Sequence, residues 1–205
     1  MVQRRAIFLD RDGVINHNRP DYIKSWDEFV FLPHALEGLK LIAATGWTTI
    51  VITNQSAIGR GIITEAAVRG IHARMIAEAE RAGGCIHAVY FCPHKPEDNC
   101  ACRKPRIGMY LEARSAFGID LARSYVIGDT VSDVAAAQAI GAQPILVLTG
   151  LDSKDQLRLV EENHPGYVVA DDLLSAVEWI YQTENLPGKA LPKLTRRLDR
   201  DLTPR

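Results

Sequence analysis

Residues 7–13 read I-F-L-D-R-D-G, an apolar run that ends abruptly in two aspartates and a glycine. Such a run is typical of a buried strand in a parallel sheet. The strand would carry Asp10 and Asp12 to its carboxyl end, the edge where α/β sheets place their functional loops. Two carboxylates at close range repel each other unless a cation lies between them, so this edge suits a divalent metal and chemistry on a phosphate. Asp10 is the predicted nucleophile.

Strand and helix patterns alternate along most of the chain. Apolar runs predict strands at residues 6–9, 49–52, 88–91, 125–127 and 144–148, with a weaker one at 167–169. Apolar residues at helical spacing predict helices at 35–44, between Thr64 and Gly83, and at 108–117, 132–140 and 172–182.

This alternation predicts an α/β fold, with a parallel sheet, helices on both faces and right-handed crossovers. A single domain is expected over residues 1–182, with no large cap domain between its motifs. The strand and helix patterns stop at residue 183, so residues 183–205 are expected to form a flexible C-terminal extension.

The composition is ordinary for a globular protein. Hydrophobic residues make up 47% and charged residues 24% of the chain, and the net charge of −1 leaves no basic footprint for nucleic acid. No apolar run approaches the ~20 residues of a membrane span, and no signal-peptide pattern precedes the first strand. We therefore expect a cytoplasmic monomer whose partner is a small molecule, not a nucleic acid or a membrane.

Polar side chains follow three of the predicted strands. Asp10 and Asp12 end the first strand, T-N-Q at 53–55 follows the second, and Asp129 follows the fourth. Parallel strands bring their carboxyl ends to one edge of the sheet, so these groups are expected to meet. Phosphoryl transfer needs a nucleophile, positive charge on the phosphoryl oxygens and a proton source for the leaving group. These segments, with Lys104, supply each part.

Each group has an expected role in phosphate-ester hydrolysis. Asp10 attacks the phosphorus and forms an aspartyl phosphate. Asp12 protonates the departing oxygen and then deprotonates the water that hydrolyses the intermediate. Thr53 donates a hydrogen bond, and Lys104 supplies positive charge, to the transferring phosphoryl group.

A magnesium ion is expected beside the nucleophile. Its predicted ligands are Asp10, the main-chain carbonyl of Asp12, and Asp129, because Mg²⁺ prefers hard oxygen donors. Asp133 lies four residues after Asp129 and is expected to orient Lys104 or the metal-bound waters.

A second metal site is predicted in the loop at residues 92–102. The pattern C-x-H-x5-C-x-C places three thiols and one imidazole in this loop, which matches the tetrahedral preference of structural Zn²⁺. The predicted ligands are Cys92, His94, Cys100 and Cys102. Four protein ligands leave no open position, so this zinc would be structural. Arg103 and Lys104 follow directly, and an ordered loop would fix both cations over the phosphate site.

The segments D-R-D-G-V, T-N-Q, R-K-P and G-D-T-V-S-D resemble the four motifs of the haloacid dehalogenase superfamily of aspartate-nucleophile phosphatases. The resemblance spans about residues 6–150. It implies a Rossmann-like sheet with central strand order 3-2-1-4-5, dependence on Mg²⁺ and the roles given above.

Two longer segments refine the resemblance. T-N-Q-S-A-I-G-R-G and C-R-K-P-R-I-G-M are similar to those of heptose bisphosphate phosphatases in the histidinol-phosphatase-like subfamily. This likeness implies hydrolysis of the 7-phosphate of D-glycero-D-manno-heptose 1,7-bisphosphate, in the route to the inner-core heptose of lipopolysaccharide. Histidinol phosphate, or another small phosphomonoester, is the alternative substrate, and Thr130 departs from the lysine found there in some heptose phosphatases.

A bisphosphate substrate requires donors for its second phosphate. Arg103 is the preferred candidate, because a guanidinium group matches phosphate oxygens. Further contacts to the phosphates or the sugar are expected from Asn54, Gln55, Arg60, Asn18, Arg19, Asp21 and Tyr22. Arg11, between the two aspartates, is expected to serve the structure and not the substrate.

Two functions of another class remain. A receiver-like module also accepts phosphate on an aspartate, but its acceptor ends the third strand, whereas the third strand predicted here leads to Cys92. A zinc-dependent interaction module would use the cysteine loop alone. Steady release of phosphate in the presence of Mg²⁺ separates the enzyme from both.

Overall fold

The computed structural model of the protein describes residues 4–187. Within these residues the strands form one six-stranded sheet in the order β3-β2-β1-β4-β5-β6, in which every neighbouring pair is parallel. The strands are β1 (Ala6–Leu9), β2 (Thr48–Asn54), β3 (Ala88–Cys92), β4 (Tyr125–Gly128), β5 (Gln143–Val147) and β6 (Val168–Ala170). The predicted α/β fold and the central order 3-2-1-4-5 are confirmed, and β6 extends the sheet beside β5.

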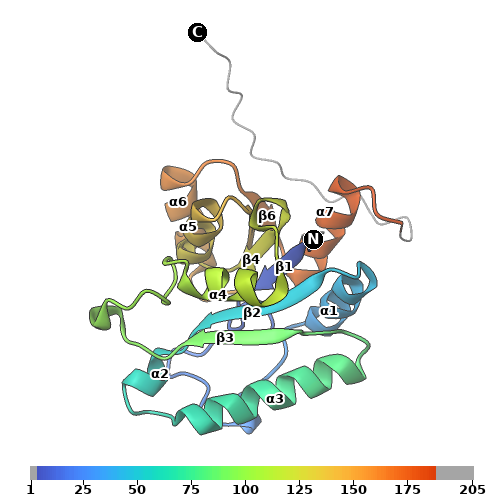
Figure 1. The fold of residues 1–205 in the computed structure, drawn as a ribbon. Coiled ribbons are helices and arrows are strands. Elements are labelled where there is room, and N and C mark those ends of the chain that lie inside the picture. Colours follow the sequence, from blue (N-terminus) through green and yellow to red (C-terminus); the bar gives the residue numbers. More distant parts are fainter. Residues whose placement is uncertain (1–3, 188–205) are drawn as a thin grey trace.

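Helices cover both faces of this sheet (Figure 1). One layer contains α1 (Ala35–Ala44), α3 (Glu65–Arg81) and α7 (Leu173–Thr183), and the other contains α4 (Gly108–Phe117), α5 (Val131–Ala139) and α6 (Ser153–Asn163). Successive side chains of β1 point to opposite faces of the sheet. Ile7 and Leu9 pack with the first helix layer, and Ala6 and Phe8 pack with the second.

Helix α6 is the one long helix of the described residues that the sequence patterns did not predict. Its sequence, S-K-D-Q-L-R-L-V-E-E-N, buries only Val160 completely. Val160 packs on Val134 of α5 and Leu146 of β5. So narrow an apolar stripe leaves little periodic signal, because most of the helix surface faces solvent. The short helix α2 (Ser56–Gly59), directly after β2, was also not predicted.

The strand order switches sides next to β1. From β1 it proceeds to β2 and β3 on one side, and later returns to β4, β5 and β6 on the other. In parallel α/β sheets, the crevice at such a switch point opens beyond the carboxyl ends of the strands and receives ligands. Asp10 follows β1 and Asp129 follows β4, so both lie at this crevice.

The predicted domain boundary at residue 182 falls inside α7, which ends at Thr183. The next residue, Glu184, accepts two hydrogen bonds from Arg5, at 2.6 and 2.9 Å, and one from the Tyr125 hydroxyl. These contacts join the end of α7 to the start of the sheet. The remainder of the predicted extension, residues 188–205, lies outside the described residues. Among residues 4–187, no helix is both long enough and apolar enough to span a bilayer.

Candidate active site

The turn after β1 is held tightly against the sheet. The main-chain carbonyl of Arg11 accepts from the amides of Ile15 and Asn16, and the amide of Gly13 donates to the carbonyl of Asn16. Gly13 has φ +83°, a left-handed conformation in which glycine is strongly preferred. A Cβ atom at Gly13 would also lie 2.2 Å from the Asp129 carboxylate, so only glycine allows this turn to approach Asp129 so closely.

Asp10 lies beside a buried lysine. The Lys104 Nζ atom is 3.0 Å from Asp10 Oδ2, 2.6 Å from Asp133 Oδ1 and 2.8 Å from the carbonyl oxygen of Ile52. Lys104 is only 4% exposed, so its charge acts with little screening by water. Burial raises the pKa of Asp10 to about 6, although the charge of Lys104 acts in the opposite direction.

Asp129 has a carboxylate with both oxygens buried and without a hydrogen-bond partner among the described residues. Burial first, and then the negative charges of Asp10 and Asp133, raise its pKa well above the ordinary range. An uncompensated carboxylate in such a place is unfavourable unless a cation joins it. Ligand atoms of Asp10, Asp129 and Asp133 all lie within 4.8 Å of one another, so the geometry fits a divalent cation with oxygen ligands.

Three side chains hold the Asp12 carboxylate. Arg11 donates to both oxygens, with Nη2 2.8 Å from Oδ1 and 2.7 Å from Oδ2. Asn16 Nδ2 and Gln55 Nε2 each donate at 2.9 Å. Burial acts to raise the pKa of Asp12, but the Arg11 charge and these hydrogen bonds outweigh it and lower the pKa. Asp12 is therefore oriented, and ionised, in this conformation.

The end of β2 contributes the third wall of the site. Thr53 is buried, and its hydroxyl oxygen accepts a hydrogen bond of 3.0 Å from Gln55 Nε2. Asn54 binds the main chain of Lys104 through both ends of its carboxamide. Because β2 pairs directly with β1, these residues face the same crevice as Asp10.

A cavity of about 390 Å³ opens over these groups. Its walls include the predicted residues Asp10, Asp12, Thr53, Asn54, Gln55, Lys104, Asp129, Asn18, Arg19, Tyr22, Arg60 and Arg103. Of the predicted substrate contacts, Asp21 does not line it. Its carboxylate is engaged by Arg19 at 3.0 Å and Lys24 at 2.7 Å on the exposed side of the loop.

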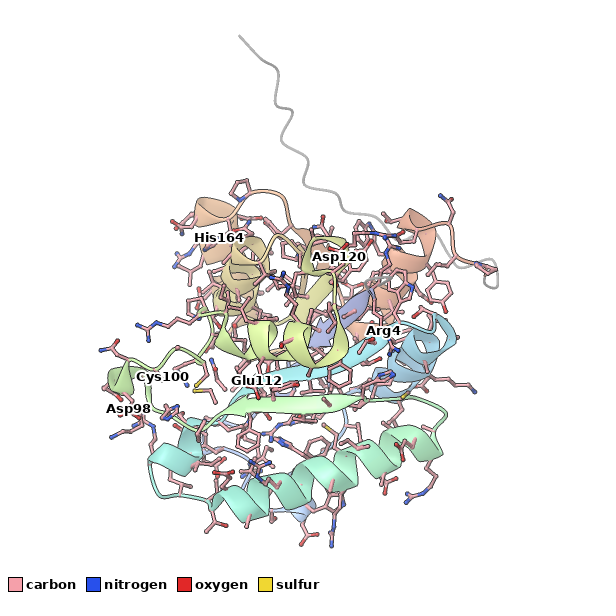
Figure 2. The ribbon with its side chains drawn as sticks, in the orientation of Figure 1. Arg4, Asp98, Cys100, Glu112, Asp120 and His164 are labelled. Atoms are coloured by element: carbon pink, nitrogen blue, oxygen red, sulfur yellow. The ribbon has the colours of Figure 1, made fainter. Side chains whose placement is uncertain are left out.

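The four predicted zinc ligands also come together. Neighbouring sulfur atoms of Cys92, Cys100 and Cys102 lie 3.3 to 3.5 Å apart, and His94 Nδ1 lies 3.3 Å from the Cys102 sulfur and 3.6 Å from that of Cys92. Zinc–sulfur bonds of about 2.3 Å give a tetrahedron with edges of about 3.8 Å, so a small expansion accommodates the ion. Figure 2 shows Cys100 on the loop between β3 and α4, with Asp98 near its tip. These side chains could hold a metal ion.

Comparisons with known proteins agree with this geometry. A family model described as HAD-hydrolase-like matches residues 101–176, a stretch that contains Lys104, Asp129 and Asp133. The chain is 37% identical over 181 residues to the D-glycero-beta-D-manno-heptose-1,7-bisphosphate 7-phosphatase of Pseudomonas aeruginosa, covering 88% of this chain and 100% of that protein. It is 37% identical to the protein of the same name from Neisseria meningitidis serogroup B, covering 89% of this chain and 98% of that one.

The chain belongs to the haloacid dehalogenase (HAD) superfamily of hydrolases. A solved structure of a relative also matches the fold. The D,D-heptose 1,7-bisphosphate phosphatase from B. bronchiseptica, complexed with magnesium and phosphate, gives a TM-score of 0.81 at 36% identity, covering 87% of this chain and 99% of that one.

Several residues that complete the site of this HAD hydrolase were not among the predicted ones. Asn16 is fully buried and donates to Asp12. Thr149, just beyond β5, donates a 2.6 Å hydrogen bond to the carbonyl oxygen of Gly13, and Gly150 packs against the Asp129 carboxylate. Thr149 and Gly150 could have been found, because they follow the fifth predicted strand as the other site residues follow theirs.

Proposed function

We propose that this HAD hydrolase removes the 7-phosphate of D-glycero-β-D-manno-heptose 1,7-bisphosphate through a phosphoenzyme intermediate on Asp10. The observation that carries the chemistry is the contact of the Asp10 carboxylate with the buried Lys104 ammonium group, beside the unpartnered carboxylate of Asp129. The names of the relatives support the choice of substrate and of the β anomer.

In the first half-reaction, an oxygen of Asp10 forms a bond to phosphorus while the bond from phosphorus to the sugar oxygen breaks. Asp12, ionised in the free enzyme, must first take up a proton as the substrate binds. It then gives this proton to the sugar oxygen, so the sugar leaves as an alcohol. In the second half-reaction, Asp12 takes a proton from water, the water oxygen bonds to phosphorus, and the bond to Asp10 breaks. Asp10 is then free and inorganic phosphate departs.

The other residues bind and neutralise the transferring group. Lys104 supplies a fixed positive charge and Thr53 a hydroxyl donor, and both groups are held in place before the substrate arrives. Mg²⁺ would be held by Asp10, Asp129 and the main-chain carbonyl of Asp12. Asp133 would support this site without binding the ion itself. When bound, the ion supplies positive charge that offsets the repulsion between the carboxylates and the anionic substrate.

The cysteine loop is assigned to structural zinc. Cys92, His94, Cys100 and Cys102 give four soft and borderline ligands with no open position. Arg103 follows Cys102 directly, lines the cavity and donates to the carbonyl oxygen of His94. An ordered loop therefore keeps the guanidinium group of Arg103 and the side chain of Lys104 in place.

The second phosphate of the substrate is assigned to the arginines of the cavity wall. Arg103 is the principal ligand, and Arg60 and Arg19 lie on the same cavity. Asn18 and Tyr22, which follow the turn after β1, line the same cavity and are assigned to the sugar hydroxyls. Charge-assisted pairing with a guanidinium group favours a bisphosphate over a monophosphate with a cationic tail, such as histidinol phosphate.

The test is a comparison of kcat/KM on the α and β anomers of the heptose 1,7-bisphosphate, fructose 1,6-bisphosphate and histidinol phosphate, each with Mg²⁺. The proposal predicts the highest value for the β heptose substrate, with phosphate released from position 7. A preference for histidinol phosphate would contradict the assigned substrate and leave the mechanism standing. We further propose a cytoplasmic monomer acting in the supply of heptose for lipopolysaccharide, for which sedimentation and cell fractionation are the tests.

A further inference from the structure

Arg11 joins the proton-transfer residue Asp12 to helix α3. The side chain of Arg11 is 1% exposed, and its Nη2 atom binds both oxygens of Asp12. Its other terminal nitrogen, Nη1, lies 3.0 Å from Nε2 of His72, which is 4% exposed. Residues 61 positions apart in the sequence therefore form one continuous chain of polar contacts, from α3 to the catalytic carboxylate.

The direction of the contact between Arg11 and His72 is fixed by chemistry. A guanidinium group only donates, so Nε2 of His72 must accept and must carry no proton. Burial, and then the nearby charge of Arg11, lower the pKa of His72 to about 3, which keeps the ring neutral at physiological pH. The ring also packs edge-on against Phe91 of β3, with ring centroids 5.5 Å apart. The acceptor atom is therefore held in one place.

We propose that His72 is a positioning residue, which fixes the Arg11 guanidinium group so that this group orients the Asp12 carboxylate for proton transfer. The inference rests on the role of Asp12 given under the proposed function. No contact between His72 and the substrate is required, since His72 acts through Arg11 alone.

The geometry explains why the orientation of Asp12 depends on this support. Arg11 donates to both oxygens of the carboxylate, while Asn16 donates to Oδ1 alone and Gln55 to Oδ2 alone. Asp12 must present one oxygen to the departing ester oxygen, to which its proton moves as the phosphorus–oxygen bond breaks. A guanidinium group that lost the His72 acceptor would have an unsatisfied donor in a buried place and would move to satisfy it. The Asp12 carboxylate would then lose one of its anchors.

A comparison of substrates with different leaving groups distinguishes this positioning role of His72 from a merely structural one. A sugar alkoxide is a poor leaving group and needs the proton from Asp12, whereas p-nitrophenolate leaves without one. Misplacement of Asp12 must therefore slow transfer from the sugar ester more than transfer from p-nitrophenyl phosphate. Because kcat/KM covers the steps up to formation of the phosphoenzyme, the ratio of the two kcat/KM values isolates this proton transfer.

The experiment measures both kcat/KM values for His72→Leu, His72→Gln and Asp12→Asn in the Mg²⁺-loaded enzyme. The His72→Leu change removes the acceptor, and we expect a loss of about tenfold on the heptose bisphosphate but less than about threefold on the aryl ester, as part of the ~10²–10⁴-fold that acid–base help supplies. The His72→Gln change retains an acceptor oxygen and should recover most of that loss. The Val68→Ala variant, on the same helix and also buried, is the matched control and should leave the ratio unchanged.

One outcome would overturn the inference. It is an unchanged ratio of the two kcat/KM values in His72→Leu, whether both values fall equally or neither falls, while Asp12→Asn shows the expected discrimination. If Asp12→Asn lowers kcat/KM equally for both substrates, the acid role of Asp12 in the proposed function fails. Should His72→Leu not fold, His72→Met removes the acceptor with a more adaptable side chain and gives the same comparison.

Discussion

The carboxamide of Asn54 is paired with the main chain of Lys104. Asn54 Oδ1 accepts from the Lys104 amide at 3.1 Å, and Asn54 Nδ2 donates to the Lys104 carbonyl oxygen at 3.3 Å. The two residues belong to different segments, the end of β2 and the loop before α4. This pair fixes the main chain of Lys104 on both sides of its Cα atom, at the amide and at the carbonyl, without help from the cysteine cluster. The ammonium group therefore reaches Asp10 from a fixed position.

Removal of that pair should displace the lysine. We expect Asn54→Ala to lower kcat by about tenfold, because two hydrogen bonds of about 0.5–1.5 kcal/mol each are lost and the Lys104 main chain is released. Asn54→Asp keeps the acceptor for the amide and should lose less. Steady-state kinetics on the heptose bisphosphate give both values, and equal activity of Asn54→Ala and the native enzyme would show that the loop holds Lys104 without help from β2.

Loss of the loop metal should act through Lys104 as well. A zinc-free Cys100→Ser/Cys102→Ser double variant is expected to lose most of its activity even with saturating Mg²⁺, because the loop that precedes Arg103 and Lys104 loses its support. Metal analysis by mass spectrometry should find one zinc ion per native chain and none in the variant. Full activity, with an unchanged Mg²⁺ requirement, in the zinc-free protein would contradict this account of the loop.

Gly150 should be intolerant of even one added carbon. A Cβ atom there would lie 2.0 Å from Asp129 Oδ2, so Gly150→Ala must displace a carboxylate assigned to the magnesium site. We expect the Mg²⁺ concentration for half-maximal activity to rise more than about tenfold, as a loss of at least about 1.4 kcal/mol of binding free energy. Gly70→Ala, on α3 with no atom within 4 Å of the added Cβ, is the control and should keep the native requirement.

The buried His72 should make the protein less stable in acid. The pKa of His72 is lowered from 6.5 to about 3, so between these values the unfolded chain binds a proton that the folded protein does not. The free energy of unfolding therefore decreases as the pH falls below 6.5, by up to about 1.4 kcal/mol per pH unit from this residue. Above pH 6.5 this contribution is absent, because the ring is neutral in both states.

Urea denaturation across that pH range tests the prediction. The native protein should lose stability toward acid more steeply than His72→Leu, and the difference between the two curves should vanish above about pH 7, apart from a constant offset. Parallel curves from pH 4 to 8 would contradict it, because they would mean that the folded protein protonates His72 as readily as the unfolded chain does.

Much of the site was predictable because it follows a topological rule. Asp10, Thr53 and Asp129 each follow an apolar run, and parallel strands bring such residues to one edge of the sheet. The grouping of Cys92 with Cys102 was predictable from local spacing alone. The contact between Arg11 and His72 was not, because it depends on how α3 is rotated against β3, which sequence periodicity does not specify. Asp21 was predicted as a substrate contact because it belongs to the loop at residues 18–22. It does not line the cavity, and its carboxylate is paired with Arg19 and Lys24.

Replacement of the nucleophile gives a further check. Asp10→Asn should abolish turnover while retaining the native circular dichroism spectrum, because an amide of nearly the same volume keeps the packing but cannot attack phosphorus as a carboxylate does. Measurable steady turnover in a preparation free of native enzyme would contradict the role of Asp10.

The stereochemical course at phosphorus tests the central claim most directly. A phosphoenzyme on Asp10 requires two successive in-line displacements, so hydrolysis of a chiral phosphorothioate analogue of the substrate in isotope-labelled water should proceed with overall retention of configuration. Overall inversion would mean a single displacement by water, and it would contradict the assignment of Asp10 as the nucleophile.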